Sequence, residues 1–480
     1  MTSRSVASCL GLAVALAGSP GCGKRKVEPI PTGSLVITQV PAPAGAAVTG
    51  SLPDGRYPDG SRVVLAKVPL DPKSVTVLSE GLLAAGEPVV SPDSGRVLFS
   101  GKGRDGRWQV YEVTAAGGPP RALTAVEGGA TSPALLADGS VVFASPVPRS
   151  KDAGPGPPVA LWALSASDKG PRRLTFGTDS ATDPTVLSDG RILFASAQPG
   201  ASPGRTALFT IYNDGTGVSP YACQHDGGGD VGRPREISGG RVAFLSRQEK
   251  AAGEEGQPEA VVAARPWRSR ALLLPRGAGR CTSVEPGEGG SLLLAMQTTG
   301  AAGQGPRGIR EVLEGPSGTD RLLFHDPAWN EVEAIRVEPR KRPMGRISTI
   351  NPAKKTGVVF SIDVNHTTYE PATPAVRIRI LTAGDGGARP LGEVPVHADG
   401  SFLAEVPSDV PLGFEALDRD GKVVRRLPPS VWVRPGENRG CIGCHEPHGL
   451  APRNRRPLAV KGPAVAVGLA PNETYRGSAR

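Results

Sequence analysis

Residues 87–100, EPVVSPDSGRVLFS, decide the fold, because a similar line recurs along the chain. An apolar run leads into Ser91-Pro92-Asp93, a turn follows, and a second apolar run begins after Arg96. Two apolar runs joined by a short turn indicate a β-hairpin. The prolines that mark successive copies, Pro88, Pro133, Pro184 and Pro234, are 45, 51 and 50 residues apart. A period in this range indicates a repeat architecture.

Each copy continues with two further short strands. The third strand is predicted at Trp108–Val113, Leu161–Leu164 and Leu208–Tyr212, and the fourth at Arg121–Thr124 and Arg172–Thr175. Four short strands in every ~40–50 residues are typical of a β-propeller blade. Weaker copies at 241–246 and 291–295 make five, and residues 62–78 supply most of a sixth. Single blades cannot bury their faces, so we predict a closed propeller of about six blades over residues 34–336.

The repeated line Ser-Pro-Asp-x-Gly, apolar strand, Val-Tyr and Arg-x-Leu-Thr resembles the blades of TolB-type propellers. The resemblance is good over residues 80–215 and looser elsewhere. It implies a fold and a surface that docks a protein partner, and it implies no reaction.

A second β-rich region follows the repeats. Residues 337–355 are basic and interrupted by prolines, which predicts a hinge. Strands are then predicted by alternation at 358–364, 375–381, 392–396, 401–406, 413–418 and 422–424. We therefore expect a small β-sandwich over 356–434, followed at 435–480 by a short haem-binding segment with a basic tail. The fold class expected for the whole chain is all-β.

The chemistry-bearing motif is Cys441-Ile442-Gly443-Cys444-His445. Cys-x-x-Cys-His is the attachment pattern of c-type haem. Cys441 and Cys444 can bond the two vinyl groups of one haem, and His445 can then bind the iron. Two alternatives are a thioredoxin-like thiol pair and half of a zinc site; the first needs a βαβ pattern and the second a further ligand pair, and neither is visible in the sequence. We expect one haem c.

The block from Gly392 to Glu446 resembles the middle domain of the hydrazine synthase alpha-subunit family. The motifs that carry the resemblance are Asp399–Phe402, Val406-Pro407, Leu417–Gly421 and Arg434–Glu437. That family combines a propeller with c-type haems in anammox chemistry and includes exported relatives of unknown function. The resemblance also implies an iron-binding Tyr four residues after the motif His, where this chain has Gly449, and a further haem domain, although the sequence has no second Cys-x-x-Cys-His. Only Cys441, Cys444 and His445 carry over, and His445 is expected to bind iron as in ordinary c-type haems.

The other axial position of the iron is open at this point. His366 and His397 are the candidate sixth ligands, because both lie in the region expected to lead into the haem motif. A five-coordinate or water-bound iron is the alternative.

The N-terminus predicts export. Residues 1–22 contain Arg4, a short apolar run and then Cys22, an order that resembles a bacterial lipoprotein signal in which this cysteine receives the lipid. Simple secretion is the alternative. Residues 23–33 read as a tether. The expected location is the periplasm or the outer membrane, with a lipid anchor as the only contact with the membrane.

Two cysteines are left over by these assignments, Cys223 and Cys281. An oxidising compartment would permit a disulfide between them. The repeat puts them about one blade apart, so the bond depends on whether their Cα atoms approach closely enough.

The charge pattern excludes some classes of function. The net charge of +9 is spread thinly, and the basic tail lacks the interleaved aromatics of a nucleic-acid site, so no nucleic-acid partner is expected. No catalytic triad or phosphate loop is visible. Three functions stay open: an exported monohaem protein that transfers electrons with a protein redox partner, a hydrazine-synthase-like haem enzyme acting on a small nitrogen or oxygen species, and a propeller scaffold with a structural or sensory haem.

Overall fold

The computed structural model describes residues 30–42, 56–114, 117–148, 159–197, 205–223, 230–247, 255–275, 278–297, 307–314, 319–368, 373–384, 387–444 and 455–469. Nearly all regular structure in these ranges is β-strand. The helical elements that lie wholly within these ranges are short 3-10 turns, η2 (Pro72–Ser74), η3 (Pro266–Arg268), η4 (Glu288–Gly290) and η5 (Leu458–Lys461). No helix within these ranges is long and apolar enough to span a bilayer.

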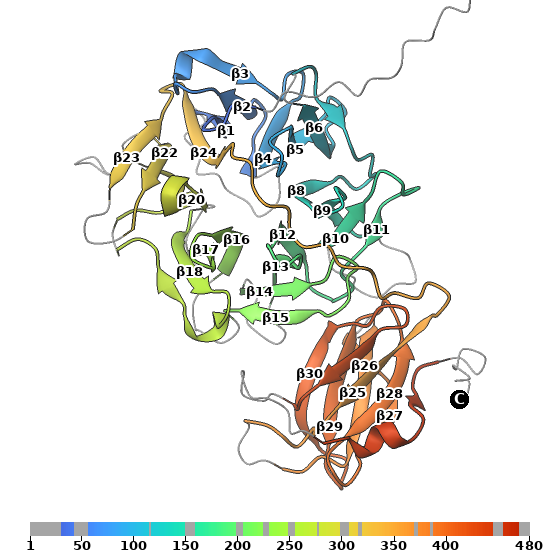
Figure 1. Cartoon of the computed structure of the whole chain (residues 1–480). Coiled ribbons are helices and arrows are strands. Elements are labelled where there is room, and N and C mark those ends of the chain that lie inside the picture. The colour runs from blue at the N-terminus through green and yellow to red at the C-terminus, as the bar shows by residue number, and fades with distance from the viewer. Residues whose placement is uncertain are drawn as a thin grey trace, which may run out of the picture.

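Six four-stranded antiparallel sheets form a ring (Figure 1). From the innermost strand outward, blade one contains β24 (Trp329–Arg336), β1 (Leu35–Pro41), β2 (Arg62–Ala66) and β3 (Val75–Val77), and blade two contains β4 (Ala84–Val90), β5 (Arg96–Lys102), β6 (Trp108–Thr114) and β7 (Arg121–Ala122). Blade three contains β8 (Thr131–Leu135), β9 (Val141–Pro146), β10 (Val159–Leu164) and β11 (Arg172–Arg173), and blade four contains β12 (Ala181–Val186), β13 (Ile192–Ala197), β14 (Thr206–Ile211) and β15 (Ser219–Ala222). Blade five contains β16 (Asp230–Ile237), β17 (Arg241–Arg247), β18 (Gln257–Val262) and β19 (Ala271–Leu272), and blade six contains β20 (Cys281–Pro286), β21 (Leu292–Gln297), β22 (Arg307–Val312) and β23 (Asp320–Phe324). The predicted all-β propeller is confirmed.

The second strand of each blade contains a continuous run of buried apolar residues. In β5, Val97, Leu98 and Phe99 are all at most 1% exposed, although a strand that covers a core on one face would bury only alternate residues. Both faces of these strands are covered because each blade packs against two neighbours. This is why the sequence shows continuous apolar runs at these positions.

The ring closes by pairing its two ends. β24, the last propeller strand in the sequence, pairs antiparallel with β1, so that Leu35 lies opposite Arg336 and Ile37 opposite Ala334. The first and last strands therefore share one blade, and β24 covers the inner edge of β1.

The second domain is a β-sandwich. One sheet has the order β31 (Asn438–Cys441), β25 (Thr356–Ser361), β28 (Phe402–Pro407) and β32 (Val465–Ala466); the other has the order β27 (Gly387–Pro395), β26 (Arg377–Gly384), β29 (Leu412–Leu417) and β30 (Val423–Val431). Ile378, Ile380, Phe402 and Leu412 are among the apolar residues buried between them. The sandwich does not stop at the predicted boundary of residue 434, because β31 and β32 both belong to its first sheet.

Residues 337–355, predicted as a hinge, form an extended strap that is held along the propeller (Figure 1). The Arg340 amide donates to the Pro92 carbonyl at 2.9 Å, and the Met344 amide donates to the Ser188 carbonyl at 2.9 Å. A Cβ at Gly190, whose φ is +85°, would lie 2.2 Å from the Met344 oxygen, so only glycine allows this close approach. The strap thus runs from blade two to blade four before it enters the sandwich.

Candidate functional site

The cysteine motif is held at the edge of the sandwich by a strand ladder. β31 pairs parallel with β25, and Cys441 lies opposite Ser361. The ladder continues beyond the strand, because the amides of Ile362 and Asp363 donate to the carbonyls of Cys441 and Ile442 at 3.0 and 3.1 Å. The main chain around the first cysteine is therefore fixed, while the residue itself is exposed.

The second cysteine is fixed by the turn that contains His366. The Cys444 amide donates to the His366 carbonyl at 3.1 Å, and a Cβ at Gly443 would lie 2.3 Å from the same carbonyl oxygen. Gly443 is therefore the residue that lets the loop lie flat against this turn. Cys444 is half-buried and packs against the sandwich core. The two cysteines thus occupy one short, anchored loop.

The two candidate sixth ligands, His366 and His397, differ in how directly their backbone contacts the cysteine loop. His366 is half-buried and directly contacts the motif loop, as just described. His397 is exposed and starts the turn that reaches Gly400, whose carbonyl accepts from the Val364 amide. The structure therefore brings His366 to the cysteine motif and leaves His397 one turn further away. His445 lies outside the described residues, as does Cys22.

A half-buried arginine, Arg455, also contacts the residues next to this loop. Arg455 Nη2 donates to the Asp399 carbonyl at 2.6 Å, and the same nitrogen lies 3.5 Å from Asp363 Oδ2. Asp399 Oδ2 in turn accepts from the Leu458 amide at 2.8 Å. These bonds connect the chain after the motif to the strand before it.

The strand that carries the motif is also docked onto the propeller. Glu437 Oε1 accepts from the Gly217 amide at 2.9 Å, and its Oε2 accepts from the Arg434 amide at 2.8 Å. The Trp432 indole donates to the Gly215 carbonyl at 2.9 Å. Both propeller contacts fall on the β14–β15 turn of blade four, so the chain that leads into the motif strand is docked on blade four.

Arg434 is the central residue of this interdomain contact. Its guanidinium donates to the carbonyls of Arg173 and Asp214, at 3.1 and 2.8 Å, and its Nε lies 2.7 Å from Asp409 Oδ1. Burial lowers the pKa of Arg434, and the Asp409 carboxylate opposes that shift. An arginine in this position can satisfy several carbonyls at once because its donors are arranged in a rigid fork.

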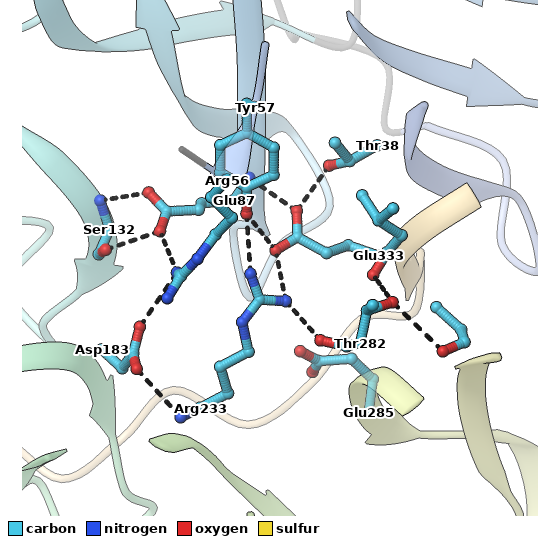
Figure 2. Close-up of polar contacts among 12 residues, drawn as sticks. Thr38, Arg56, Tyr57, Glu87, Ser132, Asp183, Arg233, Thr282, Glu285 and Glu333 are labelled. Atoms are coloured by element: carbon cyan, nitrogen blue, oxygen red, sulfur yellow. Dashed lines mark hydrogen bonds and ion pairs between the residues drawn. The ribbon is translucent and has the colours of Figure 1, made fainter. Parts of the chain in front are cut away.

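A second polar cluster occupies the centre of the propeller (Figure 2). Arg56 Nη1 donates to Glu87 Oε1 at 2.9 Å and to Asp183 Oδ1 at 3.3 Å, so it bridges blades two and four. Arg233 Nη1 lies 2.9 Å from Glu333 Oε1, and Tyr57 donates to the same oxygen at 2.5 Å. Arg56 and Tyr57 come from the connection between β1 and β2, which inserts into the ring. A small cavity adjoins this central cluster.

The backbone aims these side chains inward by a repeated irregularity. Glu87, Ser132, Asp183 and Arg233 have φ values of 57°, 52°, 49° and 53°, and each directly precedes a proline. The strand register shifts at each of them, as expected for a β-bulge. Non-glycine residues at positive φ cost on the order of 1–3 kcal/mol each, so the central hydrogen bonds must stabilise this geometry.

The charges of the central cluster balance locally. Burial raises the pKa of Asp183, but Arg56, Arg233 and Arg247 overcome this effect and lower it to about 2. The pKa of Glu333 is also lowered, because Arg233 and the hydrogen bonds from Tyr57 and Thr38 outweigh its burial. No group of three or more His, Cys, Asp or Glu side chains in the described ranges is arranged to hold a metal ion. This cluster is therefore an ionic lock across the ring.

Cys223 and Cys281 are not joined by a disulfide. Cys281 carries a free thiol and packs with residues of β20 and β21, and burial raises the pKa of this thiol to about 12. Cys223 packs in the cluster between blades four and five. The two cysteines therefore lie in neighbouring but separate hydrophobic clusters of the propeller.

The similarities to known proteins cover both domains. Residues 350–446 match the family model described as the hydrazine synthase alpha subunit middle domain. The fold resembles that of Kuenenia stuttgartiensis hydrazine synthase with a TM-score of 0.76 and 18% identity, over 90% of this chain and 72% of that chain. The segment that matches this family model includes Cys441 and Cys444, and the structural likeness extends over the propeller as a shared fold.

Two TolB structures are also similar to this chain. The putative TolB of Agrobacterium tumefaciens is 18% identical with a TM-score of 0.37, over 50% of this chain and 88% of that chain. TolB of Acinetobacter baumannii is 15% identical with a TM-score of 0.38, over 56% of this chain and 61% of that chain. The chain has no match among curated proteins.

Three groups of important residues in this chain were not assigned a role by the sequence. The polar residues that precede the repeat prolines form the central cluster, and the regular spacing of those prolines was the feature of the sequence that could have revealed them. Arg434 and Glu437 were noted only as part of a family motif, whereas they dock the motif strand on blade four. Arg56 and Tyr57 had no sequence signal, because they lie outside every repeat.

Proposed function

We propose that this chain is an exported monohaem c-type protein that transfers electrons to or from a protein partner docked on its propeller. One observation carries the proposal: the loop with Cys441 and Cys444 is anchored through its main chain, while Cys441 is exposed. This arrangement fits a haem bound through two thioethers, because the thiols can be reached while the loop does not need to refold.

The chain's own residues have distinct parts in this proposal. The Cys441 and Cys444 thiols would each add across one vinyl group, with the sulfur bonded to one vinyl carbon and the thiol hydrogen transferred to the other. His445 would bind the iron, and His366 is the candidate for the opposite side because its turn contacts the loop. A bound haem c would supply one-electron transfer. Export by the 1–22 signal, with lipidation at Cys22, would bring the chain to the compartment where c-type haem is attached.

The covalent haem gives the decisive experiment. The protein should be produced in a bacterial host that matures c-type cytochromes. We expect a haem stain that survives a denaturing gel, and its loss in the Cys441→Ala, Cys444→Ala double variant without loss of the propeller's circular dichroism. The matched control is Cys281→Ala, which removes a buried thiol elsewhere and should keep the stain. Wild-type protein without covalent haem would overturn the proposal.

The family match favours a second candidate function, a haem enzyme acting on a small nitrogen or oxygen species. The two functions differ in whether one axial position of the iron is free to bind a small molecule. A reduced spectrum that carbon monoxide leaves unchanged indicates that protein ligands fill both axial positions, as suits an electron carrier. Rapid carbon monoxide binding would favour the enzyme. A structural or sensory haem in a scaffold is the third candidate, supported if the ligated iron exchanges electrons with no small protein carrier.

A further inference from the structure

The strap crosses the same face of the propeller at which the described chain begins (Figure 1). Its bonding partners Pro92 and Ser188 belong to turns between the first and second strands of their blades, and such turns lie on one face of the ring. The Ile30 amide donates to the Ser94 carbonyl at 3.1 Å, in the same turn as Pro92. The first described residues therefore lie beside the strap, on what we call the strap face.

The three most exposed large apolar side chains among the described residues all lie on this strap face. Ile347 is 90% exposed, Met344 64% and Val68 56%. The first two belong to the strap. Val68 lies near its start, because a Cβ at Gly33 would be 3.2 Å from the Val68 side chain and the Gly33 amide donates to the Val337 carbonyl at 2.9 Å. Single exposed apolar residues are ordinary, but their concentration on one face indicates an interaction site.

Four exposed cations accompany these apolar side chains on the strap face: Lys67, Lys341, Arg342 and Arg346. No ion pair within the described part of the chain includes any of the four. The carboxylates of the neighbouring turns are engaged locally, since Asp93 accepts from the Ser91 hydroxyl at 2.6 Å and Asp189 pairs with Arg191 at 2.7 Å. The strap face therefore presents positive charge around exposed apolar groups.

This combination fits an anionic lipid surface. Apolar side chains can enter the boundary between headgroups and acyl chains, while neighbouring cations lie against the phosphate groups. The position of the expected lipid site points the same way. Cys22 precedes Ile30 by eight residues, and eight residues span at most about 29 Å. A lipid on Cys22 would therefore hold the strap face close to the bilayer.

We propose that the strap face lies on an anionic membrane surface, with Val68, Met344 and Ile347 at the headgroup boundary and Lys341 and Arg342 against the lipid phosphates. The inference rests on the export and lipidation included in the proposed function. It adds a second membrane contact to the lipid anchor, which the sequence alone predicts as the only one. It does not depend on haem, because the cysteine motif lies in the other domain. Contact along the strap would give the propeller one fixed orientation over the membrane.

Vesicle flotation tests the strap face without the lipid anchor. The chain from residue 23, exported with a general secretion signal that is then cleaved off, keeps every described residue. We expect it to bind phosphatidylglycerol vesicles at least about tenfold more tightly than phosphatidylcholine vesicles, and high salt should remove the difference. The double variant Lys341→Gln, Arg342→Gln should weaken binding roughly twentyfold, because each cation at an anionic surface contributes about fivefold.

The matched control is the double variant Arg104→Gln, Arg107→Gln. It also removes two exposed cations, but from the β5–β6 turn, at the opposite end of β5 from the turn that contains Pro92. Binding to phosphatidylglycerol should be unchanged. Ile347→Ser tests the apolar contact and should weaken binding several-fold, whereas Leu322→Ser, at a 46% exposed position on β23, should not. Circular dichroism checks that each variant is folded.

The strap-face assignment is overturned if the two kinds of vesicle bind equally or not at all, or if the Lys341→Gln, Arg342→Gln variant binds as well as the unmodified chain. Binding of soluble polyglutamate without binding of vesicles would also overturn it and would assign the face to an acidic protein. Mass spectrometry of the N-terminus made with the chain's own signal reports lipidation separately. A lipidated chain that fails to float rejects this inference alone, whereas flotation of a chain whose Cys22 carries no lipid supports the strap face and rejects the anchor.

Discussion

Asp183 is charged in the interior of the propeller because arginines surround it. Its carboxylate accepts from Arg56 and from the Arg233 amide, and its pKa is about 2. An unfolded aspartate titrates near 3.9. Because the folded pKa is the lower one, this residue stabilises the fold above about pH 4, and the contribution is lost as the pH falls toward 2.

We therefore expect Asp183→Asn to destabilise the protein at pH 7 by about 3 kcal/mol, because Arg56 and Arg233 lose the buried carboxylate between them and keep Glu87 and Glu333. The gap between variant and unmodified protein should narrow by roughly 2–3 kcal/mol as the pH is lowered from about 4 to 2. Urea unfolding at a series of pH values measures both effects.

The control for this experiment is Asp320→Asn. Asp320 pairs with Arg310 at 2.7 Å, but its side chain is 54% exposed, so the loss should be below about 1 kcal/mol. Equal losses for the two variants, or a gap that stays constant between pH 4 and 2, would contradict the ionic-lock assignment.

Among the elements, β31 is the one whose position depends on the other domain. Its preceding residues contact the β14–β15 turn through Trp432, Arg434 and Glu437. Arg439, inside the strand, donates to the Val218 carbonyl at 2.5 Å. The motif strand is thus held from two sides, by β25 and by blade four.

Arg434→Met should loosen this strand without unfolding either domain. We expect a loss of about 2–4 kcal/mol, because Asp409 and two carbonyls lose a buried donor. Faster hydrogen exchange at the Ile362 and Asp363 amides, which donate to the motif loop, would report the local effect. Arg321→Met, which removes a guanidinium that is 67% exposed, serves as the control and should leave these amides unchanged. Unchanged exchange in Arg434→Met would show that β25 alone holds the motif.

The sequence predicted the elements well and the contacts between them poorly. Apolar runs such as Val97–Phe99 recur once in every repeat, so they identify the blades directly. The parallel pairing of β31 with β25 joins residues about 80 positions apart and leaves no local pattern. The same limit applies to His366: its place beside Cys444 follows from a turn that packs on a distant loop.

At the scale of the whole molecule, the two domains are connected more firmly than a hinge would connect them. The strap bonds to blade four through Met344 and through Asp214, which accepts from Ser348 at 3.0 Å and from the Thr349 amide at 3.0 Å. The contacts at Trp432 and Arg434 add a second attachment. Basic residues followed by prolines suggested a flexible linker, and composition alone cannot reveal that such a segment lies against a surface.

Cutting the strap should therefore leave the two domains together. Lys341 and Arg342 are exposed, so limited trypsin digestion should cleave beside one of them. We expect two bands on a denaturing gel but one peak in native size-exclusion chromatography, with the cut position assigned by mass spectrometry. The same digestion of Arg434→Met should release part of the sandwich at moderate urea concentration. Separate elution of the fragments from unmodified protein would show that the strap is the only strong connection.

Blade one can close only late in synthesis of the chain. Thr38 of β1 and its partner Glu333 of β24 are 295 residues apart, so β1 has no inner neighbour until almost the whole propeller has been made. At about 5–20 residues per second this delay is on the order of 15–60 s. Throughout that interval the apolar segment Leu35–Pro41 presents a bare strand edge, the kind of surface on which nascent chains aggregate. A holding chaperone should consequently crosslink to this segment in stalled chains that end before residue 329, and should lose it once β24 has emerged.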